Sequence, residues 1–250
     1  PALNLAAFGL VLSLSLIIES PVIMLLSTAI ALVRDTQSYR SLRAFTIVLI
    51  SLLTLVTALV AWTRLYDLVV TGLLGIPDNI GAAARPAFRI MLFWTAAIGW
   101  RRFYQGVLVR QGQTSKVSYG TAIRLACAIG TAFGLTQWGR LPGAQVGAWA
   151  LMVGVLSEAL ATYLLALPVV RRVYQAPSTP LKNPLTTRTI LRFHLPLAAT
   201  SMLTLVVQPL TAAALARLAL PTLTLAAWPV VFTTLLVMRG WGMALQETTV

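Results

Sequence analysis

Long apolar runs separated by short, basic stretches form the main pattern of this chain. Seven runs predict helices that cross a membrane, because about 20 apolar residues span the hydrocarbon core. The predicted spans cover residues 4–33, 44–62, 87–100, 119–138, 145–170, 189–216 and 222–246. The third run is the shortest; we expect it to begin near Ala82, with Arg85 and Arg89 reaching toward the interface or a wet cavity. The pattern predicts an all-α, polytopic membrane bundle.

Composition supports the membrane interpretation and disfavours several other classes. The 250 residues are 58% hydrophobic and only 10% charged, whereas a soluble domain is about 25% charged. A single cysteine, Cys127, and a single histidine, His194, argue against a disulfide framework, a Cys/His metal site and bis-histidine haem. We therefore expect neither a metal nor a cofactor. The chain also shows no paired carboxylates and no nucleophile constellation, so we do not expect an enzyme.

The net charge of +13 has a topological explanation. Basic residues are interrupted by apolar spans rather than gathered on one soluble face, so no nucleic-acid partner is expected. If the spans alternate, one set of connections carries thirteen of the nineteen Lys and Arg residues and the other carries five, with Arg239 inside a span. The positive-inside rule then assigns the richer set, with loops 34–43, 101–118 and 171–188, to the cytoplasm. A multi-pass protein of the inner (cytoplasmic) membrane is the prediction.

The basic loop between the third and fourth spans is a candidate surface for membrane lipid. Anionic headgroups attract juxtamembrane basic residues. The candidates are Arg101, Arg102, Arg110 and Lys116. The alternative is that these residues only set the topology.

An internal repeat appears when the sequence is shifted by 220 residues. Residues 1–30 then match residues 221–250 at nine positions, and the shared start reads Pro-x-Leu-x-Leu-Ala-Ala-aromatic. The offset contains six spans, and an even number makes the two repeats parallel. The chain is therefore predicted to hold helices two to eight of a 6+6 protein, with residues 1–175 in the first lobe and 176–250 beginning the second.

Several segments resemble the multidrug/oligosaccharidyl-lipid/polysaccharide (MOP) exporter superfamily, which includes the multidrug and toxin extrusion proteins. The long first helix, with Ile18-Glu-Ser-Pro21 and Arg34-Asp35, is similar to the second helix of that superfamily. The stretch Trp100-Arg-Arg-Phe-Tyr-Gln-Gly106 is similar to a helix end before its basic turn. A more distant resemblance is to the progressive ankylosis family of small-anion exporters. The loop signature of the major facilitator fold is not visible over residues 33–40.

The resemblance implies a transporter that works by rocking of two lobes. The expected function is export or flipping of small amphipathic or lipid-linked solutes by ion-coupled antiport. Span 189–216 contains no Asp or Glu, so a proton rather than sodium is the expected coupling ion. The alternatives are small-anion export, resembling pyrophosphate export, and a structural bundle without transport.

Charged residues inside spans are costly and usually face protein or water. Glu19 lies beside Pro21, and proline leaves the carbonyl four residues back without its helical partner, so we expect a kink there. Glu19 is thus a candidate proton or cation site, or else a buried structural group. The offset places Arg239 opposite Glu19, and the resemblance implies that the two face each other across a cleft as a gate; alternatively, Arg239 pairs within its own half.

Glu158 and Gln208 complete the candidate pathway, which also includes Pro21, and two features outside it concern His194 and a glycine pair. Glu158 is either a second titratable group or a structural hydrogen-bond partner, and Gln208 lines a cavity or only marks a kink at Pro209. His194 is predicted to be a solvated interfacial residue. The small-xxx-small pair Gly130 and Gly134 predicts close helix packing.

Overall fold

Helices make up the secondary structure in the described part of the chain. A computed structural model describes residues 1–175 and 185–248, without side-chain detail at 173–175, 236, 237 and 239–248. The elements, in chain order, are α1 (Ala2–Ile23), α2 (Leu25–Leu32), α3 (Thr36–Trp62), α4 (Leu65–Asp67), π-helix η1 (Leu68–Leu73), α5 (Asp78–Ile90), 3₁₀-helix η2 (Met91–Phe93), α6 (Trp94–Arg110), α7 (Thr114–Trp138), α8 (Gly143–Gln175), α9 (Thr187–Leu205), α10 (Val207–Leu215) and α11 (Pro221–Thr248).

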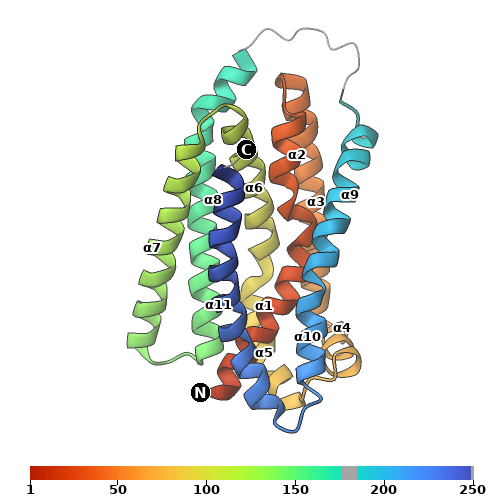
Figure 1. Ribbon diagram of the computed structural model, residues 1–250, viewed down its shortest axis with the longest axis vertical. Coiled ribbons are helices and arrows are strands. Elements are labelled where there is room, and N and C mark those ends of the chain that lie inside the picture. The colour runs from red at the N-terminus through yellow and green to blue at the C-terminus, as the bar shows by residue number, and fades with distance from the viewer. Residues whose placement is uncertain (176–184, 249–250) are drawn as a thin grey trace.

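These elements join into seven long helical segments that run alternately up and down the bundle (Figure 1). Four of them are long and apolar enough to cross a membrane: Ala2–Leu32, Thr36–Trp62, Gly143–Arg172 and Thr187–Leu215. The chain is thus a candidate multi-pass membrane protein with an all-helical fold over the described residues.

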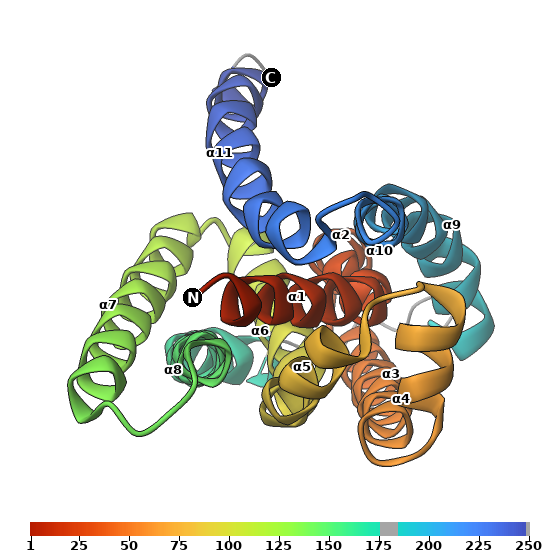
Figure 2. The ribbon, with the colours of Figure 1, turned by 90° about the horizontal axis from the view of Figure 1, so that it is seen from below.

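Helix α1 occupies the middle of the bundle (Figure 2). Its neighbours include α5, α6, α8, α9 and α11, and its small residues Ala6 and Ala7 are fully enclosed. Small side chains let helices approach closely, so α1 can contact neighbours on several sides. By contrast, α7 lies at the edge beside α8, and along α7 only Gly120 is buried.

The predicted cytoplasmic loops are wrong in extent, because helices continue through them. Most of residues 34–43 forms the start of α3, whose first turn is capped by the Asp35 side chain accepting from the Ser38 amide at 2.8 Å. Helix α6 runs on to Arg110, which leaves only 111–113 before α7. Helix α8 extends to Gln175, and 176–184 lie outside the described residues. Arginine and glutamine favour helices almost as well as leucine, so an apolar run underestimates helix length.

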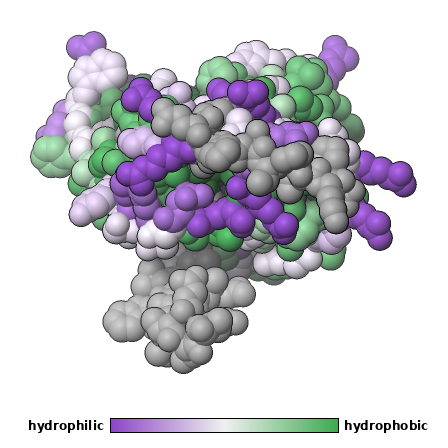
Figure 3. Space-filling view, turned by 90° about the horizontal axis from the view of Figure 1, so that it is seen from above, coloured by the Kyte–Doolittle hydropathy of each residue, from purple (hydrophilic) through white to green (hydrophobic). Residues whose placement is uncertain are grey.

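Exposed basic residues nevertheless collect at one end of the bundle, which we call the basic end. Viewed from above, this end carries many hydrophilic side chains (Figure 3). Its exposed arginines include Arg34, Arg40, Arg110, Arg171, Arg172, Arg188 and Arg192. The opposite end carries the turns between α3 and α5, between α7 and α8, and between α10 and α11.

Candidate functional site

Glu158 anchors a cluster of charged and polar side chains inside the bundle. The carboxylate, on α8, is 0% exposed and accepts from Arg101 Nη1 of α6 at 2.5 Å. Arg124 of α7 lies 3.7 Å from the same oxygen. The other carboxylate oxygen accepts from Gln105 Nε2 at 3.3 Å and Thr121 Oγ1 at 3.2 Å. A buried carboxylate requires such hydrogen-bond and charge partners, and α6 and α7 supply them.

Glu19 is the second buried carboxylate and lies on α1 at 5% exposure. Its Oε2 accepts a hydrogen bond from the indole Nε1 of Trp94 on α6. Arg101, Arg102 and Arg124 are close enough to interact with it electrostatically. The structure therefore brings Glu19, Glu158, Arg101 and Arg102 into one buried charge cluster, which sequence reasoning had divided between a pathway and a loop.

Arginines outnumber carboxylates in this cluster. Three guanidinium groups, of Arg101, Arg102 and Arg124, share two carboxylates. Among the described residues, Nε of Arg101, Nε of Arg102 and Oε1 of Gln105 are buried without a hydrogen-bond partner. Unpaired buried donors are costly, so the cluster has donor capacity for an anionic group.

The expected kink at Pro21 lies three residues later instead. Helix α1 continues through Pro21 to Ile23, and the break falls at Met24. The carbonyl that proline leaves unpaired belongs to Ile17, and the Ser20 hydroxyl donates to it at 2.8 Å. The predicted exposed oxygen beside Glu19 is thus already satisfied.

His194 is buried at 3% exposure, so its predicted solvated position is wrong. Its Nδ1 lies 2.8 Å from Oγ1 of Thr28 on α2, and its ring meets Phe45 of α3 edge-on at 5.4 Å between centroids. The Thr28 hydroxyl also lies within hydrogen-bond distance of the Met24 carbonyl, at 2.9 Å. Thr28 and His194 therefore join α9 to the broken segment of the first helix.

Gln208 contributes to a small cavity between α1, α10 and α11. Its Oε1 accepts from Nε1 of Trp228 at 3.2 Å. The cavity has a volume of about 40 Å³, enough for a few water molecules. Its lining comprises Gly9, Leu12, Ser13, Leu16, Gln208, Trp228, Pro229, Phe232 and Thr233. The Arg239 side chain lies outside the described residues, and so does the predicted Glu19–Arg239 gate.

The four residues assigned to a basic loop all lie on helices. Arg101 is buried and Arg102 half-buried within α6, near Glu158 and Glu19. Arg110 Nη1 donates to the Ile30 carbonyl at the end of α2. Lys116 Nζ donates to the Leu165 carbonyl of α8 at 3.4 Å.

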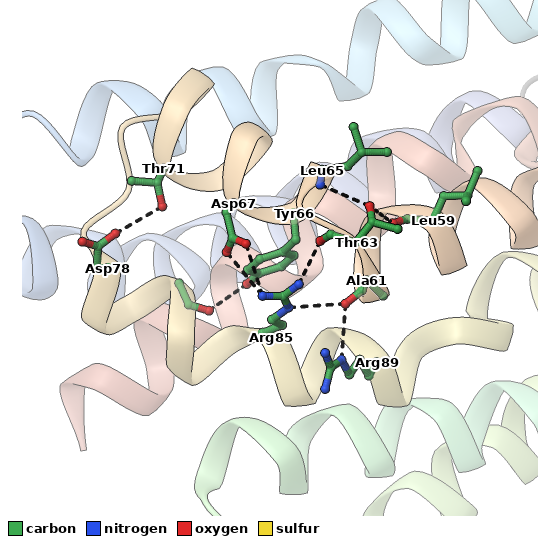
Figure 4. Close-up of polar contacts among 11 residues, drawn as sticks. Leu59, Ala61, Thr63, Leu65, Tyr66, Asp67, Thr71, Asp78, Arg85 and Arg89 are labelled. Carbon is green, nitrogen blue, oxygen red and sulfur yellow. Dashed lines mark hydrogen bonds and ion pairs between the residues drawn. The ribbon is translucent and has the colours of Figure 1, made fainter.

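At the end opposite the basic end, Arg85 and Arg89 line a cavity of about 350 Å³, as expected for arginines near a wet cavity (Figure 4). Tyr66, on α4, donates to the Gly81 carbonyl at 2.8 Å, and burial raises the pKa of its phenol, which keeps it a neutral donor. Sequence reasoning missed Tyr66 and Asp67 here. Their Leu-Tyr-Asp-Leu context has no distinctive signal.

Comparison of the chain with protein-family models, curated proteins and solved structures found no match. Among the described residues, no group of three or more His, Cys, Asp or Glu side chains could hold a metal ion.

Proposed function

We propose that this chain is part of a membrane transporter, an exporter or flippase similar to MOP proteins, which works by alternating access. One observation carries the proposal. Gly9 of α1 packs so closely against Pro229 of α11 that an added Cβ would overlap the proline ring. These two residues are also related by the 220-residue offset of the repeat.

Such a contact is what a two-fold axis between parallel repeats requires, because residues near the axis meet their own counterparts. Leu12 with Phe232, and Ser13 with Thr233, are further offset pairs, and both pairs line the same cavity. Helices α1 and α11 run in the same direction (Figure 1). Parallel repeats related by an axis along the membrane normal are typical of transporters that bind substrate at the repeat interface.

Ion coupling is assigned to Glu19, which lies one turn beyond Leu16 of the cavity on the same helix. Protonation would remove its charge from a site shared with Arg101, Arg102 and Arg124, and would change which groups those arginines attract. A proton is the proposed coupling ion. The basic end is proposed to face the cytoplasm, as the positive-inside rule favours.

The excess of buried guanidinium groups favours a second candidate, export of a small anion. Arginine is well suited to carboxylate and phosphate groups because its planar fork binds them bidentately. If the protein exports a small anion, the anion rather than Glu19 accepts hydrogen bonds from the unpaired donors of Arg101 and Arg102.

The test is efflux from liposomes containing the full-length protein, with an imposed pH gradient and either a cationic dye or pyrophosphate inside. Glu19→Gln should abolish gradient-driven dye efflux. The matched control is Asp35→Asn, which also converts a carboxylate to an amide but keeps an equally good helix cap. Gradient-driven dye efflux that persists in Glu19→Gln refutes the coupling role. Pyrophosphate efflux without dye efflux assigns the second function, and absence of both refutes transport of either class.

A further inference from the structure

The cavity at the end opposite the basic end is formed by one face of α5 and the turn that precedes it. Asp78, Gly81, Ala82, Arg85 and Arg89 recur at three- and four-residue spacing along α5, so they share a face. Tyr66, Asp67 and Thr71 close the other side from α4 and η1 (Figure 4). We call this cavity the α5 pocket.

The two arginines of the α5 pocket differ in what they have left to bind. Arg85 donates to the Thr63 carbonyl at 2.8 Å and to Asp67 at 3.3 Å, and its guanidinium stacks on Tyr66. Arg89 donates only through Nε, to the Ala61 carbonyl at 3.3 Å. Its two terminal nitrogens make no hydrogen bond to any described residue, so Arg89 has donors available for an oxyanion.

The acidic side of the α5 pocket also has free capacity. Asp78 accepts at Oδ1 from Thr71 at 3.3 Å, and its other oxygen has no partner among the described residues. Asp67 is exposed and accepts only from Arg85. Two carboxylates and two guanidinium groups sum to no net charge. The pocket therefore suits a zwitterion better than a simple anion.

The spacing of the charged side chains and the occupied aromatic faces favour one class of zwitterion, a phosphate linked to a primary ammonium. Arg85, which binds Asp67, and Arg89 are four residues apart on α5, about 6 Å along the axis. A phosphate joined to an ammonium by a two-carbon link has a similar reach. Free carboxylate oxygens accept hydrogen bonds, which a primary ammonium can donate and a quaternary one cannot. The aromatic faces that could hold a quaternary ammonium, Tyr66 and Trp62, are already covered by Arg85 and Arg89.

The surface beside the α5 pocket indicates a lipid rather than a free solute. Leu68 and Leu73 of η1 are 66% and 71% exposed, and Trp62 at the end of α3 is 51% exposed. An exposed apolar segment at the end of a membrane-spanning helix, next to a tryptophan, is typical of the membrane interface. Acyl chains can thus lie along η1 while the headgroup enters the cavity.

We propose that the α5 pocket binds the phosphoethanolamine headgroup of a phospholipid, with the phosphate on Arg89 and the ammonium on Asp67. This site is separate from the transport proposal and does not require it.

The test is titration of the purified full-length protein in detergent with short-chain phosphatidylethanolamine, followed by calorimetry. Short-chain phosphatidylcholine, phosphatidylglycerol and free phosphoethanolamine serve as comparison ligands. Wild type should bind the ethanolamine lipid at least tenfold more tightly than the other three. Equal affinity for the three lipids overturns the headgroup assignment. Equal affinity for free phosphoethanolamine overturns the lipid assignment in favour of a soluble solute.

Substitutions in the α5 pocket test whether the lipid binds there. Arg89→Gln should weaken binding of the ethanolamine lipid at least tenfold, whereas Arg140→Gln should leave it unchanged. Arg140 is a matched control because it lies at the same end and also stacks on a tryptophan, Trp138. Asp67→Asn, at an exposed position, should reduce the preference for the ethanolamine lipid over phosphatidylglycerol. Unchanged binding in both Arg89→Gln and Asp67→Asn refutes the site. If Arg89→Gln does not fold, Asp67→Asn alone decides.

Discussion

Arg101 of α6 and Glu158 of α8 form an ion pair of 2.5 Å between side chains that are 8% and 0% exposed. The pair joins two helices that are distant in sequence, and Arg124 brings a third helix to the same carboxylate. The Glu158 carboxylate therefore links three helices, α6, α7 and α8.

Breaking this pair should be costly. Glu158→Gln leaves three donors facing a neutral amide, and loss of one partner of a buried pair costs about 3–5 kcal/mol. We expect the free energy of unfolding in detergent, measured by urea titration, to fall by that amount. The double variant Arg101→Met with Glu158→Leu should recover most of the loss, since well-packed apolar replacements of buried pairs are often neutral. A double variant no more stable than Glu158→Gln would contradict this account.

The sequence predicted an all-helical fold, and four of its seven predicted spans coincide with helices that are long and apolar enough to cross a membrane. Helix ends were predicted poorly, since Arg101, Arg102 and Arg110 interrupt the apolar run but not the helix. The charge cluster was not predictable because its contacts are not local. Arg101 and Glu158 are 57 residues apart, and Thr28 and His194 are 166 residues apart. The position of Arg85 and Arg89 beside a cavity could be predicted because a short span cannot hide two arginines in lipid.

Glycine packing gives a second prediction, and here the sequence misled. The pair Gly130 and Gly134 on α7 has nothing within 4 Å of an added Cβ, so the predicted close packing is wrong. Gly106 of α6 belongs to no small-xxx-small motif. A Cβ added there would lie 2.6 Å from the Leu26 carbonyl oxygen. That atom is backbone and cannot move aside cheaply.

Gly106→Ala should therefore destabilise the protein by about 1–3 kcal/mol, the usual cost of overpacking. Gly130→Ala should be neutral or stabilising by up to about 1 kcal/mol, because alanine is the better helix former. Urea titration of both variants in the same detergent measures the contrast. Similar stability changes in the two would show that the α2–α6 contact is looser than described.

Thr28 and Thr46 give a matched pair for the third prediction. Both hydroxyls are fully buried, but Thr28 contacts His194 at 2.8 Å, whereas Thr46 has no hydrogen-bond partner among the described residues. Thr28→Val leaves a buried imidazole nitrogen without its partner and should cost about 1–3 kcal/mol. Thr46→Val removes an unsatisfied hydroxyl and should be neutral or stabilising. Urea titration measures the unfolding midpoint of both variants, and equal slopes of the free energy of unfolding against urea show that both unfold in the same way. If Thr46→Val is the less stable variant, the Thr28–His194 hydrogen bond is refuted.

The last prediction concerns the helices that carry the repeat. Ser13 of α1 and Thr233 of α11 line one cavity, and the proposed transport cycle requires these helices to separate. In a Cys127→Ser background, Ser13→Cys with Thr233→Cys should be joined by a short bifunctional thiol reagent, and dye efflux should then stop. Ser13→Cys with Thr136→Cys is the control, because Thr136 is exposed on α7 at the bundle edge. Cleaving the reagent's disulfide linkages should restore efflux. Full-rate efflux after complete cross-linking would show that α1 and α11 remain together during transport, which is incompatible with rocking about this contact.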